Sequence, residues 1–471
     1  MSRPITHRTL DDIAREIAAG HLSSLEVTDA CLARIEQVAP KLDCIADMDA
    51  DAARTAARRS DQARRKNGNA GPLDGIPLAH KDMYYRQGRI SGCGSKIRAS
   101  FVPDHTATAL QRLDRAGALD IARLNMVEFA LGVTGHNDVM PTPRNPWNTA
   151  HFTGGSSSGS GAAVAARLVY GALGSDTGGS IRLPAACCGL VGMKPTLGRV
   201  SRYGAMPLSH SLDTVGPLTR TVRDNALLLG VIAGTDGNDP TTSPLAVPDY
   251  LDDIEGDIRG LRIGVPGTYF YDGIDPGVEQ LVRSSLDVYR AAGADIIALD
   301  LPASIAATNS MTSLITAVEG STLHYEWLRD RYDDYGNQTR TRFSLGLMTP
   351  ATVYHQAISL RTKILDEFAG AVFDKVDVLH TPMINLPVPA YSPSDSVADQ
   401  AFLDLIARIG HCTRPINYLG LPGLNVPCGF TDNGLPCSFQ LVGRPFDEKT
   451  LYRAGYAYEQ QTGWTDQAPD L

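Results

Sequence analysis

The sequence lacks any apolar run that approaches the roughly 20 residues of a membrane-spanning helix, and its first residues, MSRPITHRTL, hold no apolar signal core. It also lacks a basic cluster: Lys and Arg are scattered, and the formal net charge is -9. Phosphate binding needs a concentrated basic surface. We therefore expect a cytoplasmic protein that binds no membrane and no nucleic acid and acts on a small molecule.

Cysteine is scarce too, with 8 residues in a chain of 471. This is too sparse for a disulfide framework, so we expect reduced, buried thiols. The sequence contains no CxxC pair, no HExxH and no Cys/His cluster at zinc-finger spacing. It therefore gives no support for a metal site.

The patterns that are present indicate one α/β unit over residues 1–471. Apolar residues at helical spacing predict helices in residues 1–70. Short apolar runs alternate with helical patterns over residues 73–231, which is typical of a sheet with helices on its faces. A second helical stretch, about residues 303–373, is expected near the substrate pocket, since such excursions often cover the pocket of a hydrolase.

Two Gly/Ser turns form the densest signal, FTGGSSSGSG at 152–161 and GSDTGGSIR at 174–182. Each is expected to place serine hydroxyls and backbone N–H groups at a helix N-terminus, where partial positive charge favours an anion. Acyl transfer needs such donors for its tetrahedral oxyanion. We predict that the donors are Thr177, Gly178, Gly179 and Ser180.

Other interpretations of these turns fit less well. Residues 155–159 match the GxSxG elbow with Ser157 as nucleophile, but the preceding segment NPWNTAHFT is polar, whereas the elbow follows an apolar strand. The downstream histidines, such as His210 and His380, are isolated. A phosphate loop is disfavoured because GxxxxGK[ST] is absent.

The strings GIPLAHKD (75–82), GGSSSGSGAAVAA (154–166), GSDTGGSIR (174–182) and GMKPTLGRVSRYG (192–204) resemble the amidase signature family in order and spacing. The resemblance implies a single α/β/α domain with a twisted mixed sheet of many strands flanked by helices. It also implies that the enzyme needs no cofactor and no metal.

Carried onto this chain, the resemblance implies that Lys81 is the base, Ser156 the proton relay and Ser180 the acylated nucleophile, with a cis peptide at Ser156. Lysine acts as a base only when burial or neighbouring charge lowers its pKa. The competing lysine, Lys194 in GMKPT, is interpreted as structural support.

Two sets of further residues are expected around these groups. Ser157, Ser158, Asp176 and Arg182 are expected to hold the turns by hydrogen bonds. The pocket walls are expected at Tyr84 and the neighbouring Tyr85, and at Phe129, Ala130, Leu131, Gly132 and Val133.

The resemblance covers enzymes that hydrolyse amides, anilides and carbamates, and we expect a monomeric or homodimeric amidase for a small substrate of this kind, such as a urethanase or aryl acylamidase. The alternative is the A subunit, a glutaminase, of a tRNA-dependent amidotransferase. Leu183 counts against it, because that subunit typically has glutamine there. A catalytically inactive binding or scaffold protein is a further alternative, disfavoured because Lys81, Ser156 and Ser180 are all present.

Overall fold

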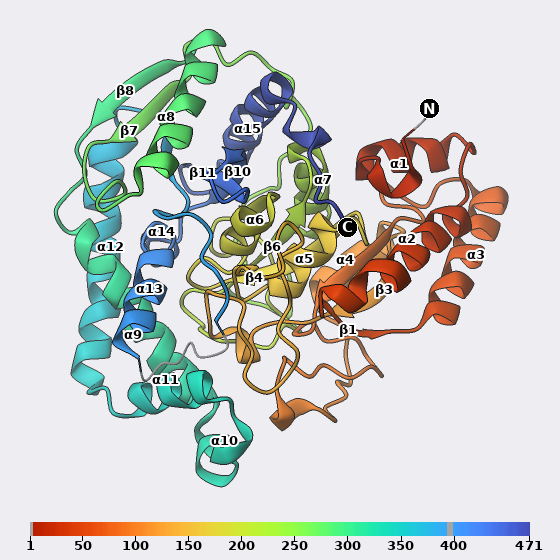
Figure 1. Ribbon diagram of the computed structural model, residues 1–471, viewed down its shortest axis with the longest axis horizontal. Coiled ribbons are helices and arrows are strands. Elements are labelled where there is room, and N and C mark those ends of the chain that lie inside the picture. The colour runs from red at the N-terminus through yellow and green to blue at the C-terminus, as the bar shows by residue number, and fades with distance from the viewer. Residues whose placement is uncertain (1–2, 393–398) are drawn as a thin grey trace.

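The computed structural model describes residues 3–392 and 399–471. Within this part of the chain, eleven strands form one mixed sheet in the order β1-β3-β2-β4-β6-β5-β10-β11-β9-β7-β8 (Figure 1). The strands are β1 Ile45–Met48, β2 Pro77–Lys81, β3 Leu119–Leu124, β4 Gly171–Asp176, β5 Val191–Lys194, β6 Thr214–Thr219, β7 Arg262–Pro266, β8 Asp295–Leu299, β9 Val378–Pro382, β10 Gly423–Phe430 and β11 Pro436–Val442.

Helices cover this sheet, and a group of helices lies beside it on one side of the molecule (Figure 1). Their bounds are α1 Leu10–Ala18, α2 Ser24–Val38, α3 Ala50–Asn67, α4 Thr108–Arg115, α5 Ser158–Ala165, α6 Arg182–Cys188, α7 Val222–Ile232, α8 Pro276–Ala291, α9 Ile305–Leu323, α10 Tyr325–Asp330, α11 Asn337–Leu347, α12 Ala351–Val372, α13 Gln400–Ile409, α14 Arg414–Leu419 and α15 Glu448–Thr462.

The sheet has layers on both faces, as two neighbouring residues of β10 illustrate. Gly423 faces the Arg182 side chain of α6, whereas Leu424 faces Gly455 of α15. Because successive residues of a strand point to opposite faces, α6 and α15 lie on opposite sides of the sheet. The expected α/β/α domain with a large mixed sheet is thus confirmed.

The order of the strands brings distant segments together. Strands β2 and β4 pair in parallel, and β4 pairs antiparallel with β6. Strand β5 pairs antiparallel with β10, so residues 192–194 lie beside residues 423–425. The C-terminal part of the chain therefore packs directly against the segment that follows the second Gly/Ser turn.

The N-terminal region begins with three capped helices. The side chain and backbone of Ser23 exchange hydrogen bonds with Glu26 in a capping box at the start of α2, and Asp49 caps α3. Between these helices lies β1, which pairs antiparallel with β3. The expectation of helices alone in residues 1–70 missed this strand, because four residues with a half-exposed pattern carry too little periodicity to be recognised.

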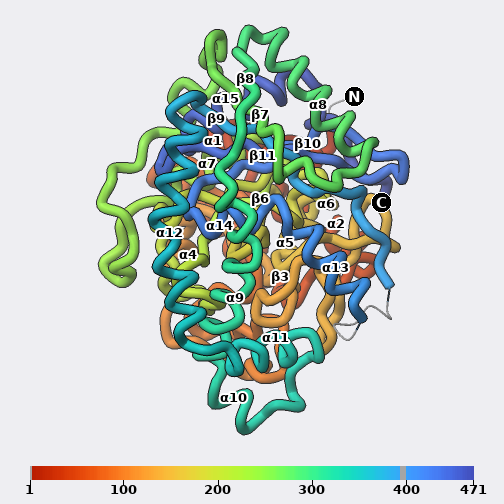
Figure 2. Tube along the Cα trace, turned by 90° about the vertical axis from the view of Figure 1, so that its left-hand side faces the viewer, coloured from red at the N-terminus to blue at the C-terminus, as the bar shows by residue number. Residues whose placement is uncertain are grey.

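Helices α9 to α12 form the excursion expected in residues 303–373. Helix α9 contacts α11, α12 and α14, and α9 and α12 run side by side along one flank of the molecule (Figure 2). Within residues 3–392 and 399–471, no helix combines the length and apolar character needed to cross a membrane.

Candidate active site

Lys81 ends a strand that is buried along its whole length. Its Nζ donates to Ser156 Oγ at 2.8 Å and to Ser175 Oγ at 2.9 Å, and the residue is 1% exposed. Burial lowers the pKa of Lys81 to about 7, although the negative charges of Asp213 and Asp176 act in the opposite direction. A large fraction of this lysine is therefore neutral near pH 7, as a base must be.

The first Gly/Ser turn brings Ser156 between this lysine and the second turn. The Gly155–Ser156 peptide bond is cis. The backbone carbonyl of Ser156 accepts from Val127 N–H at 3.1 Å, and Ser157 N–H donates to the carbonyl of Ser180 at 3.3 Å. The two turns are thus joined through their backbones, with Ser156 buried.

The second turn follows β4 and opens α6, and Ser180 is 5% exposed there. The amide of Gly179 donates to Asp176 Oδ1 at 2.7 Å. This N–H is engaged by a carboxylate, so the prediction that Gly179 offers an oxyanion donor is wrong for this geometry. The Thr177 hydroxyl donates to Asp213 Oδ1 at 2.5 Å, which anchors the other end of the turn.

A buried ionic network supports this turn. Arg182 Nε and Nη2 donate to the two carboxylate oxygens of Asp176 at 3.0 and 3.1 Å. Asn417 Nδ2 also donates to Asp176 Oδ1, at 2.7 Å, and Arg182 Nη1 donates to Gln440 Oε1 at 3.1 Å. Burial opposes ionisation of Asp176, yet the Arg182 guanidinium holds the pKa of this carboxyl well below its usual value. Asp176 and Arg182 thus hold the second turn through hydrogen bonds to each other.

The two supporting serines differ. Ser157 Oγ accepts from Ser175 N–H at 3.3 Å, so this hydroxyl links the first turn to β4. Ser158 Oγ is buried and has no hydrogen-bond partner among the residues that the structure describes. The expectation that its hydroxyl holds a turn is wrong, because Ser158 is the first residue of α5 and its side chain packs inside.

Ser175 is a site residue that the sequence reasoning missed. It contacts Lys81 directly, as Ser156 does. Its position inside GSDTGGSIR, one residue before Asp176 on the strand leading to Ser180, is the signal that could have identified it.

A narrow cavity reaches Ser180, and part of the expected pocket wall lies there. Its lining comprises Ala130, Leu131, Gly132, Val133, Thr177, Gly178, Ser180, Leu208, Thr312, Ser313, Thr316, Arg342 and Arg414.

Three of the residues expected on the pocket wall, Tyr84, Tyr85 and Phe129, do not line this cavity. The Tyr84 hydroxyl donates to Gly174 O at 2.6 Å, inside the sheet. Phe129 packs against the rings of His324, Trp327 and Tyr335. The side chains of Tyr84 and Phe129 both pack inside the protein. An aromatic residue can pack in a core or contact a substrate, so the residue type alone does not tell which.

The cavity contains two arginines that sequence reasoning also missed. Arg342 comes from α11 and its Nη1 donates to Leu131 O at 3.1 Å. Arg414 begins α14. Each is one of many scattered arginines in the sequence, and only the packing of α9, α11 and α14 around the turn brings these two together.

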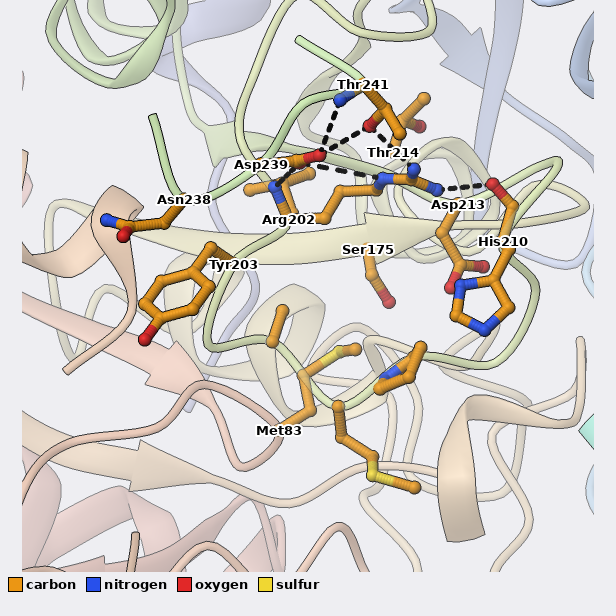
Figure 3. A pocket seen from close by; sticks show the side chains of 14 residues that line it. Met83, Ser175, Arg202, Tyr203, His210, Asp213, Thr214, Asn238, Asp239 and Thr241 are labelled. Carbon is orange, nitrogen blue, oxygen red and sulfur yellow. Dashed lines mark hydrogen bonds and ion pairs between the residues drawn. The ribbon is translucent and has the colours of Figure 1, made fainter. Parts of the chain in front are cut away.

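A larger cavity of about 240 Å³ lies next to the catalytic groups and contains Ser175 and Asp213 (Figure 3). Both side chains point toward its centre in that view. The Arg202 guanidinium on its wall donates to His210 O at 2.6 Å and to Thr241 Oγ1 at 2.8 Å. The hydrogen bond from Thr177 to Asp213 connects this cavity to the one that contains Ser180. In residues 3–392 and 399–471, no three His, Cys, Asp or Glu side chains are grouped so that they could hold a metal ion.

The chain is similar to known proteins along almost its whole length. Residues 26–452 match the protein family described as Amidase. The chain belongs to this family. It is 42% identical to the A subunit of glutamyl-tRNA(Gln) amidotransferase from Chloroflexus aggregans, over 97% of this chain and 96% of that protein. The same description applies to a Roseiflexus sp. (strain RS-1) relative, 43% identical over 98% of each chain.

Solved structures of the amidase family are similar over their full length. The A subunit of glutamyl-tRNA(Gln) amidotransferase from Thermotoga maritima is 30% identical with a TM-score of 0.83, over 98% of this chain and 96% of that chain. A protein described as part of a vestigial complex that reveals the evolutionary origins of an s-triazine catabolic enzyme is 33% identical, with a TM-score of 0.89 over 97% and 99%.

These relatives contradict the expectation of a free-standing hydrolase for a small amide, anilide or carbamate. They also contradict the expectation that the protein has no connection with nucleic acid. The full-length relatives carry the name of an amidotransferase for glutamyl-tRNA(Gln), and nothing supports a urethanase or aryl acylamidase. Leu183 does not exclude such a function, for a structural reason. It is fully buried in a cluster with Val133, Phe152 and Ala186 and is not among the residues that line the cavity containing Ser180.

Proposed function

We propose that this chain is the amide-hydrolysing A subunit of a tRNA-dependent amidotransferase, in which Ser180 removes the side-chain amide of glutamine and releases ammonia. The observation that carries the proposal is the full-length likeness to proteins named as the A subunit of glutamyl-tRNA(Gln) amidotransferase, at 42% identity over 97% to 99% of this chain. That name implies partner subunits and a tRNA ligand for the assembly.

The charge of the cavity supports an amide donor that carries a carboxylate. Burial and the nearby charge of Arg414 lower the pKa of Arg342 to about 10, so Arg342 remains charged at neutral pH. A glutamine whose amide carbon lies at Ser180 has its α-carboxylate at the far end of the side chain. A guanidinium fork matches a carboxylate in geometry and charge, which gives Arg342 a positioning role.

The proposed chemistry proceeds through an acyl-enzyme. Neutral Lys81 accepts the Ser156 proton while Ser156 accepts the proton of Ser180, whose Oγ forms a bond to the amide carbon. The C–N bond then breaks as the proton returns through Ser156 to the departing ammonia. Water attacks the resulting ester, which releases glutamate and restores the Ser180 hydroxyl. Backbone N–H groups of residues 177–180 other than that of Gly179 are the oxyanion donors in this scheme.

The test is glutamate release from glutamine, measured for the purified chain alone and with the partner subunits of an amidotransferase and glutamylated tRNA added. We expect activity that rises on addition of partners and falls at least 1,000-fold in Ser180→Ala, by analogy with the loss of other serine nucleophiles. Ser284→Ala, which removes an exposed hydroxyl on α8, is the matched control and should retain full activity. Glutamine turnover no faster than in Ser180→Ala under all these conditions would contradict the proposal.

A further inference from the structure

Arg414 brings a second positive charge to the wall of the cavity that contains Ser180. The preceding residue, Thr413, donates its hydroxyl to Gly178 O at 2.6 Å. The Arg414 Cγ lies 3.5 Å from the point that a Cβ on Gly178 would occupy. The side chain is therefore fixed against the turn where the acyl group forms.

The Arg414 guanidinium is held by neutral acceptors. Its Nη1 donates to Asn309 Oδ1 at 2.9 Å and its Nη2 to the carbonyl of Ile406 at 3.4 Å. Gly410 leaves room for the Arg414 guanidinium, because a Cβ at residue 410 would lie 2.7 Å from the guanidinium carbon. Burial lowers the pKa of Arg414 to about 10, while the Tyr269 hydroxyl acts in the opposite direction. The group thus carries a full charge at neutral pH with no carboxylate bonded to it in the described residues.

Arg342 and Arg414 both line the cavity that contains Ser180. The charge of Arg414 contributes to the lowered pKa of Arg342, so the guanidinium groups are near enough to repel each other. A negative ligand between or beside them relieves this repulsion, and a positive group on the ligand adds to it. Glutamine carries one negative carboxylate and one positive ammonium group. A second arginine attracts the carboxylate but repels the ammonium group.

We infer that Arg414 makes the cavity a site for amides that carry a carboxylate but no ammonium group, the monoamides of dicarboxylic acids, in addition to glutamine. The inference rests on the proposed function only in using the same acylation of Ser180. The Ser180 Oγ–C bond forms, the C–N bond breaks and ammonia leaves with the proton from Ser180. Water then hydrolyses the ester to a dicarboxylate.

The direct test compares three amides of one chain length on the wild-type protein. Glutaramate, the monoamide of glutaric acid, is glutamine without its amino group, and pentanamide has neither charge. We expect kcat/KM for glutaramate to exceed that for glutamine at least tenfold, with pentanamide last. Hydrolysis of glutaramate without hydrolysis of glutamine would end the glutaminase proposal and leave this inference standing. Glutamine hydrolysed faster than glutaramate would overturn the inference and leave the glutaminase intact.

Two variants assign the preference to Arg414. Arg414→Met should reduce the ratio of kcat/KM for glutaramate to that for glutamine at least tenfold, whereas Arg414→Lys, which keeps the charge, should retain most of it. Arg290→Met, which removes an exposed arginine of α8, is the matched control. An unchanged ratio in Arg414→Met would overturn the inference.

A binding measurement covers the case in which turnover is slow or a variant folds poorly. Calorimetric titration of the Ser180→Ala protein should give a lower Kd for glutaramate than for glutamine, again at least tenfold. Equal affinity for the two amides would overturn the inference.

Discussion

Asp176 and Arg182 form an ion pair in which neither side chain has any solvent exposure, and this pair spans the turn that carries Ser180. The same Asp176 carboxylate accepts the backbone N–H groups of Gly179 at 2.7 Å and Ile181 at 3.2 Å. The Asp176 carboxylate therefore both pairs with Arg182 and fixes the backbone of the turn that carries Ser180.

We predict that Arg182→Met lowers the free energy of unfolding by about 3–5 kcal/mol, because it leaves the Asp176 carboxylate buried without its partner. The double variant Asp176→Leu/Arg182→Met should recover part of this loss, since no buried charge then remains. It should not recover turnover, because the acceptor of the Gly179 amide is gone. Urea denaturation and kcat/KM on the same samples check both statements. A single variant whose stability equals that of wild type would show that the pair contributes little.

Gly179→Ala should impair catalysis by distorting the turn. Gly179 has φ of 126°, a conformation that residues with a side chain rarely adopt, and an added Cβ would lie 2.5 Å from Thr413 Oγ1. We expect at least a 100-fold loss of kcat/KM and a fall in the free energy of unfolding of about 1–3 kcal/mol. Gly237→Ala, where a Cβ meets nothing within 4 Å, is the control and should behave as wild type. Equal activity of the two variants would mean that the turn tolerates a side chain.

Much of the fold and the central groups of the site could be predicted because their signals are local. The two Gly/Ser turns and the alternation of short apolar runs with helical patterns over residues 73–231 each show their pattern within a few consecutive residues. The resemblance of the motifs to a known family then assigned Lys81, Ser156 and Ser180, and these lie on the two turns and the strand as described.

What could not be predicted depends on contacts between distant segments. Arg342 and Arg414 reach the cavity from two separate helices, α11 and α14. Tyr84 and Phe129 are aromatic, as many pocket residues are, yet their side chains contact other parts of the protein instead of the cavity. The proposed function depends on even less local information, because it rests on relatives that match the whole chain.

Glu459 should limit stability at alkaline pH. This side chain is 5% exposed and accepts Val222 N–H at 2.8 Å, and burial raises its pKa to about 8. The folded state therefore binds the proton more tightly than the unfolded state does between about pH 4.5 and pH 8, and stability falls as pH rises through this window. Glu459→Gln keeps an acceptor but cannot ionise. We expect it to exceed wild type by about 1–3 kcal/mol at pH 8.5 in urea denaturation and to match it at pH 4.5. The opposite order at pH 8.5 would refute this assignment.

The last prediction separates the two buried lysines. Burial lowers the pKa of both Lys81 and Lys194 to about 7, so an acid limb in the pH profile would not by itself identify the base. Of the two, Lys81 contacts Ser156, whereas Lys194 Nζ donates to Pro195 O at 3.0 Å. With glutamine as substrate, kcat/KM should fall about tenfold per pH unit below pH 7, because protonated Lys81 cannot accept the Ser156 proton.

Three variants test that assignment through the pH profile rather than through rate alone. Lys81→Met should lose most activity, whereas Lys194→Met should keep the acid limb near pH 7 even if its rate falls. Asp213→Asn removes a negative charge that raises the pKa of Lys81, so its acid limb should move to lower pH. Because a merely structural loss lowers the rate at every pH without moving the limb, the position of the limb is the decisive measurement. An acid limb that disappears in Lys194→Met and persists in Lys81→Met would make Lys194 the base instead.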